Sequence, residues 1–156
     1  MSQLRVNDIK NTGGLVIPNL SGTIIQVVNN PFTSLVSTGS TSFVNFTSVN
    51  ITPKYATSKI AIIAMFSTSN GGAVQVRRNS TAIFSPVNAF HVFTGTGGPD
   101  YGASTVRIPY SFNVVDSPAT TSTVTYNFDF RVYSGTFAIN EGGSGVSNII
   151  LMEVAQ

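Results

Sequence analysis

Alternation of apolar and polar residues dominates the chain and predicts strands. Residues 124–132 place apolar side chains at every even position and polar ones between them, which predicts a half-buried antiparallel strand. Residues 106–114 repeat the pattern, and Pro109, which lacks an amide donor, indicates a sheet edge or a bulge. We expect both strands to face one core. Gly, Pro or runs of Ser and Thr interrupt every stretch with helical spacing, so no helix is predicted.

Residues 59–66 are apolar on both faces. A strand of this kind is either central in a sheet covered on both sides or has an outer face that meets another subunit, and a short helix is the weaker alternative. Asn70-Gly71-Gly72 follows and predicts a tight hairpin in which residues 73–78 pair back. A second turn at Asn79-Ser80-Thr81 leads into residues 82–84.

Turn signals recur along the chain and set the fold class. They include Asn30-Pro31, Asp116-Ser117-Pro118 and the glycine-rich residues 141–145. The runs between them amount to eight to ten short strands, at the spacing typical of an antiparallel sandwich or barrel. We therefore predict an all-β protein. Its 156 residues suit one domain, and the lack of cysteine excludes disulfide frameworks and thiol chemistry.

The charge pattern excludes several partners. Only 9% of residues are charged and the net charge is +2. Apart from Arg77-Arg78 the basic residues are scattered, so no phosphate-binding face and no nucleic-acid partner is expected. The longest apolar run, residues 60–66, is far shorter than a membrane helix requires, so we expect no membrane insertion. The start of the chain has no apolar core of a signal peptide, which predicts synthesis without secretion.

Residues 1–22 differ from the rest because they contain Gly13-Gly14 and Pro18 and show no sustained alternation. We interpret them as an extended N-terminal arm that docks elsewhere, followed by a β-sandwich domain at residues 23–156. A disordered terminus is the plain alternative.

Candidate chemistry is sparse. The chain has one histidine, six carboxylates that are well separated in sequence, and no nucleophile, zinc or phosphate-loop motif. We therefore predict no enzyme, catalytic residue, metal or cofactor. Residues 94–102 form the longest loop candidate, and a glycine-rich loop with aromatic and carboxylate side chains is typical of sugar recognition, although a simple connector is the alternative. The candidate receptor residues here are His91, Phe93, Asp100 and Tyr101.

Several segments together resemble virion fibre proteins of tailed phages that infect cyanobacteria and other marine bacteria. The opening MSQLRVNDIK followed by Gly13-Gly14 is similar to the start of such proteins. The segments that follow in the same order are GTIIQVV at 22–28, TPK at 52–54, SKI at 58–60, RRNSTAI at 77–83, DSPATT at 116–121 and IILMEVA at 149–155. The resemblance covers nearly the whole chain and transfers no catalytic residue.

The resemblance implies a homotrimeric, jelly-roll-like β-sandwich whose arm attaches to another virion protein. A trimer also accounts for the two apolar faces of residues 59–66, because one of them lines the subunit interface. The expected interface residues are Ile60, Ile62, Ala64 and Phe66, and the expected anchor residues of the arm are Leu4, Val6, Ile9, Leu15 and Ile17.

The expected function is that of a short tail or baseplate fibre, located in the virion after assembly in the host cytoplasm, that attaches to a host surface glycan. The chain lacks the shaft of a long fibre, so a capsid decoration or cement protein is the first alternative. A monomeric carbohydrate-binding module is the second, and it predicts a solvated outer face over residues 59–66.

Overall fold

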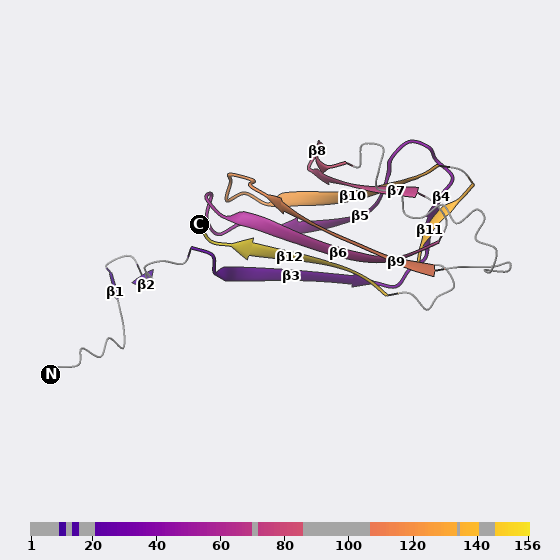
Figure 1. The fold of residues 1–156 in the computed structure, drawn as a ribbon. Coiled ribbons are helices and arrows are strands. Elements are labelled where there is room, and N and C mark those ends of the chain that lie inside the picture. The colour runs from indigo at the N-terminus through magenta and orange to yellow at the C-terminus, as the bar shows by residue number, and fades with distance from the viewer. Residues whose placement is uncertain are drawn as a thin grey trace.

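The computed structural model describes residues 10–11, 14–15, 21–69, 72–85, 107–133, 135–140 and 146–156 (Figure 1). Twelve strands and no helix occur in these ranges, which confirms the all-β prediction. The strands are β1 (Lys10–Asn11), β2 (Gly14–Leu15), β3 (Ile24–Phe32), β4 (Val36–Thr38), β5 (Val44–Ile51), β6 (Lys59–Ser69), β7 (Gly72–Arg78), β8 (Thr81–Phe84), β9 (Arg107–Asp116), β10 (Val124–Val132), β11 (Phe137–Ile139) and β12 (Ser147–Val154).

Two antiparallel sheets form the body, as predicted for a β-sandwich. The four-stranded sheet has the order β5-β10-β7-β8. In the six-stranded sheet, β3-β12-β6 continues through β11 to β4, and β9 pairs with the other edge of β6. The strands β1 and β2 pair with each other as a separate two-residue ladder.

The eight longest strands pair in a nested order along the chain. Strand β3 pairs with β12, β5 with β10, β6 with β9, and β7 with β8. The first strand of this set therefore pairs with the last, and the pairing closes inwards to the β7–β8 hairpin. Asn79 forms the turn of that hairpin with φ 52°, a left-handed conformation that Asn tolerates better than most residues. The predicted turn at residues 79–81 is confirmed.

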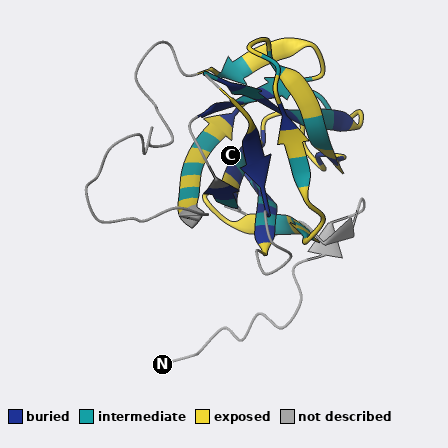
Figure 2. Ribbon diagram, turned by 90° about the vertical axis from the view of Figure 1, so that its right-hand side faces the viewer, coloured by how far each residue is buried: buried dark blue, intermediate teal, exposed yellow. Residues whose placement is uncertain are grey.

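The period-two pattern identifies the inner faces correctly. In β10 the even positions are buried, and in β9 the even positions Tyr110, Phe112 and Val114 pack against the same core. Strand β9 pairs only with β6 among the described residues, so Pro109 lies on an edge strand, as predicted. Bands of buried and exposed residues along the strands show this alternation (Figure 2).

The predicted hairpin between residues 59–66 and 73–78 is wrong. Strand β7 pairs with β10 and β8, so the chain passes from one sheet to the other between β6 and β7. Both edges of β6 are already taken, one by β9 and the other by β12 and β11. A turn signal reports only that the chain reverses locally, and the occupied edges send β7 elsewhere.

Aromatic rings fill the space between the sheets. The fully buried Phe66 ring of β6 lies 5.5 Å from the ring of Phe46, 6.0 Å from Phe112 and 6.3 Å from Phe128. Phe84 and Phe112 stack at 4.8 Å with nearly parallel planes and join β8 to β9, the edge strands of the two sheets. Contacts at these separations contribute about 0.5–1.5 kcal/mol each beyond the burial of their area.

Gly72 lies where the core leaves no room for a side chain. A Cβ atom at this residue would lie 2.5 Å from the carbonyl oxygen of Arg131 and 2.5 Å from the Phe137 ring. We expect Gly72→Ala to lower the free energy of unfolding by about 1–3 kcal/mol, because backbone and ring must move apart. Gly39→Ala is the matched control, since its nearest neighbour lies at 3.8 Å, and it should be neutral or slightly stabilising. Urea unfolding measures both, and equal values for the two variants would contradict the packing at Gly72.

Candidate functional site

The predicted receptor residues and most anchor residues fall outside the described ranges. This holds for His91, Phe93, Asp100 and Tyr101, and for Leu4, Val6, Ile9 and Ile17. Leu15 belongs to β2, where it pairs with Lys10. The roles of these residues therefore remain predictions.

The four predicted interface residues lie on the face of β6 that points into the core, whereas an interface requires the outward face. Ile60, Ile62, Ala64 and Phe66 are fully buried between the two sheets of a single chain. A neighbouring subunit cannot reach side chains that their own chain encloses, so assigning these residues to an interface is wrong. The other apolar face of β6 consists of Ala61, Ile63 and Met65, and it points away from the core.

This second face continues across four strands. Register places Met152 of β12 between Val27 and Ala61, and Ala61 beside Val115 of β9. In the next row Ile150 lies beside Ile63. The side chains of Val27 and Val115 are 57% and 62% exposed, and those of Ile63 and Met65 are 42% and 47% exposed. We call this set the apolar face: Val27, Ala61, Ile63, Met65, Val115, Ile150 and Met152.

Charge is nearly absent around the apolar face. Among the outward-pointing side chains that the structure describes on β3, β12, β6 and β9, only Lys59, at one end of β6, is charged. The remaining polar neighbours are neutral and include Asn29, Asn113 and Asn148. Contiguous exposed apolar surface of this kind marks an interaction site more often than it marks ordinary protein surface.

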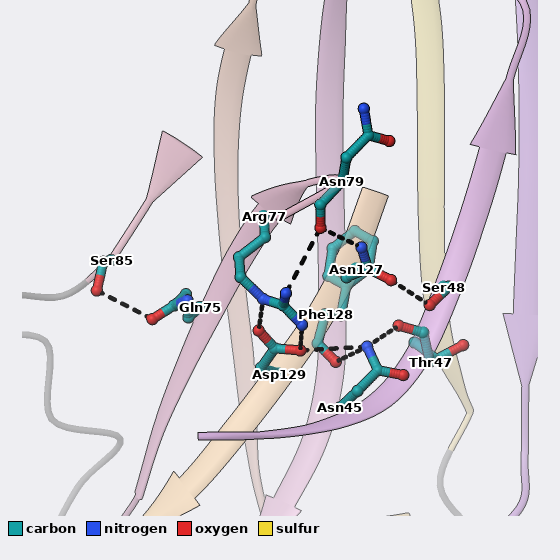
Figure 3. A network of polar contacts seen from close by, with 10 residues as sticks. All are labelled: Asn45, Thr47, Ser48, Gln75, Arg77, Asn79, Ser85, Asn127, Phe128 and Asp129. Atoms are coloured by element: carbon teal, nitrogen blue, oxygen red, sulfur yellow. Dashed lines mark hydrogen bonds and ion pairs between the residues drawn. The ribbon is translucent and has the colours of Figure 1, made fainter. Parts of the chain in front are cut away.

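The outer face of the four-stranded sheet has the opposite character (Figure 3). Asp129 of β10 is buried beneath Arg77 of β7, whose Nε and Nη2 donate to its two carboxylate oxygens, the latter at 2.9 Å. Asn45 of β5 donates to the same carboxylate at 3.2 Å, and Ser48 donates to Asn127 at 2.8 Å. The hydrogen bond with Asp129 raises the pKa of Arg77. Around Asp129, this face satisfies its polar groups within one chain.

A buried tyrosine, a carboxylate and an arginine join the sheets at one end of the sandwich. Asp116, the last residue of β9, accepts hydrogen bonds from Arg78 Nη1 at 2.8 Å and from the Tyr126 hydroxyl at 2.7 Å. Burial first, and then this hydrogen bond, raise the pKa of Tyr126 above its ordinary value of 10.0. Here a β9 residue of the six-stranded sheet is fixed to residues of β7 and β10.

Glu153 is a fully buried carboxylate at the same end. Its Oε1 accepts hydrogen bonds from the backbone amides of Lys54 at 2.7 Å and Tyr55 at 3.2 Å. The amide of Gln26 lies 3.0 Å from Oε2 and 3.1 Å from the Thr52 carbonyl, in the orientation that satisfies both contacts. The segment after β5 is thereby held against β12 and β3.

These carboxylates bind protein donors, and their arrangement is structural. Asp116, Asp129 and Glu153 each accept hydrogen bonds from other strands or loops, which is the role of a cross-link between elements. The described residues contain no group of three or more His, Asp or Glu suited to a metal ion. They also contain no helix long and apolar enough to cross a membrane. Comparison with protein families and with curated proteins found no match to this chain.

The raised pKa of Tyr126 predicts a loss of stability in alkaline solution. Above about pH 10 the tyrosine of the unfolded chain ionises while the folded protein retains the proton, so the free energy of unfolding falls as pH rises. We expect Tyr126→Phe to remove about 1 kcal/mol of this fall by about pH 11. Tyr110, whose pKa burial also raises, leaves a residual slope in the variant. Denaturant unfolding at several pH values tests this, and identical slopes in both proteins would refute it.

Proposed function

We propose that this protein is a structural component of a phage virion, a trimeric short tail or baseplate fibre that contributes to host attachment. The nested strand pairing supports a jelly-roll sandwich, an architecture that viral structural proteins share with lectins and cupins. The observation that carries the proposal is the uncharged apolar face, because it requires a partner in the assembled particle. The resemblance of the sequence to phage fibres indicates the kind of assembly.

The partner on the apolar face is a further copy of the same chain. An uncharged face provides no ionic group for a charged partner to pair with, whereas it matches another copy of itself. The apolar face is up to four strands wide and five residues long along β6, from Ala61 to Met65, which corresponds to about 300 Å² at usual strand spacings. A standard interface buries roughly 800 Å² on each partner, so the neutral residues around the apolar face complete the contact. In a trimer, three such faces meet around the threefold axis.

The two ends of the sandwich suit different roles, attachment to the virion at one end and contact with the host at the other. Gly22, where the N-terminal residues join the body, donates its amide to the Ala155 carbonyl at 2.8 Å, beside the C terminus (Figure 1). Strand β9 begins at the opposite end, where Arg107 pairs with Ser69. Arg107, the first described residue after the segment that contains the predicted receptor residues, therefore lies at the end of the sandwich remote from Gly22. This polarity supports attachment through the arm and contact with the host at the other end.

The mass of the protein in solution tests the assembly. Light scattering after size exclusion should give about three times the chain mass of 16.5 kDa. Ile63→Glu and Val115→Glu should each give a monomer, because a carboxylate buried in an apolar interface costs several kcal/mol. Leu35→Glu is the control, since Leu35 is 56% exposed but lies outside the apolar face, and it should remain trimeric.

Two outcomes would overturn this assembly. A wild-type monomer would favour the carbohydrate-binding module, and trimers of both glutamate variants would exclude the apolar face as the interface. Unchanged strand content by circular dichroism establishes that each variant is folded. Labelled antibody on intact virions then separates the fibre from the capsid decoration protein, since the fibre predicts label on the tail and the decoration protein predicts label on the head.

A further inference from the structure

Arg131 is a cation without an anionic partner in the described part of the chain. It belongs to β10, two residues after Asp129, and it is half-buried. The guanidinium carbon lies 4.8 Å from the centre of the Phe43 ring and 5.4 Å from the centre of the Tyr133 ring. Its Nε atom is buried and has no hydrogen-bond partner there. Arg77 and Arg78, by contrast, both bind carboxylates.

The carboxylate on the same strand, that of Asp129, already binds other side chains through both of its oxygens. Asp129 accepts from Arg77 through both oxygens, and Asn45 adds a third hydrogen bond at 3.2 Å. Asp116 and Glu153 are bound at the opposite end of the sandwich. A guanidinium without an acceptor is costly, and Arg131 as a whole is only half-buried, so the exposed part of its side chain is open to an external group that supplies the acceptor.

The surroundings of Arg131 favour a particular class of ligand. A planar guanidinium matches a carboxylate, which it binds through two parallel hydrogen bonds. The flanking rings of Phe43 and Tyr133 hold the guanidinium in place and offer apolar surfaces for the C–H face of a sugar. The half-buried Ser40 and the exposed Ser42 carry hydroxyl groups in the adjacent loop, where the Ser40 carbonyl accepts from the Val132 amide at 2.9 Å.

We propose that Arg131, between Phe43 and Tyr133, binds the carboxylate of an acidic sugar such as a uronic acid. In the β7–β10 register, Arg131 lies opposite Ala73 near the start of β7. This is the end of the sandwich remote from Gly22. Its role as a host-surface site rests on the proposed attachment function. The binding itself is a property of one chain and does not require the trimer.

Titration of the isotope-labelled full-length protein with glucuronate tests the site. We expect a saturable shift of the Arg131 Nε–H signal with a dissociation constant in the millimolar range, which is usual for a single sugar unit. Acetate, which has the carboxylate but no ring, should bind at least about tenfold weaker, a difference of about 1.4 kcal/mol. Glucose, which has the ring but no carboxylate, should cause no saturable shift. Glucose 6-phosphate separates a phosphate-specific site from a carboxylate-specific one.

Matched variants connect the binding to these residues. Arg131→Lys should weaken glucuronate binding at least about tenfold, because an ammonium group lacks the planar fork. Phe43→Leu should weaken it while preserving bulk. Lys54→Gln removes an exposed cation at the other end of the sandwich and should leave the affinity unchanged. Because Arg131→Lys lacks the Nε–H group, binding by the two site variants and by the control is followed through the shifts of backbone amide signals.

The outcomes are distinct from those of the assembly test. Absence of saturation by glucuronate, equal binding of acetate, a preference for glucose 6-phosphate, or full affinity in Arg131→Lys would overturn the site. Binding by a protein that proves to be monomeric would retain the site and reject the trimeric fibre. A trimer that binds no acidic sugar would retain the assembly and reject the site.

Discussion

The aromatic core between the two sheets is the constraint on which the rest of the structure depends. A strand has only two faces, and the core takes one face of every long strand. In β6 it takes Ile60, Ile62, Ala64 and Phe66, and the packing of Phe66 against rings from both sheets fixes this choice. The outward position of Ile63 and Met65 is therefore a consequence of core packing. No further strand of the described chain covers them.

The outer faces of the two sheets differ in how their side chains are satisfied. On the four-stranded sheet, Arg77 and Asn45 cover Asp129, so polar side chains satisfy one another and water completes the surface. On the six-stranded sheet, no described part of the chain covers Val27, Ile63 and Val115, and only burial removes the cost of exposing apolar groups to water. The difference between the faces gives the sandwich one side suited to solvent and one side suited to a partner.

The period-two pattern predicted β9, β10 and the inner face of the sandwich because each has apolar residues on one side only. The same rule could not choose a face for β6, where Ile62 and Ile63 are equally apolar and only packing against the core separates them. The predicted hairpin after Ser69 is wrong for a related reason, since a local turn signal carries no information about which strand edges are already occupied. Long-range contacts decide both features.

Arg131 illustrates a different limit of sequence reasoning. Its position at an outward place in β10 follows from alternation, and so does that of Asp129, so the sequence alone would pair the two residues on one strand. Arg77 lies 52 positions before Asp129 and takes that carboxylate through the β7–β10 register. That Arg131 has no anionic partner among the described residues thus follows from the position of another strand. A binding site created in this way has no sequence motif, because Arg131 is available for a ligand only where Arg77 binds the carboxylate of Asp129.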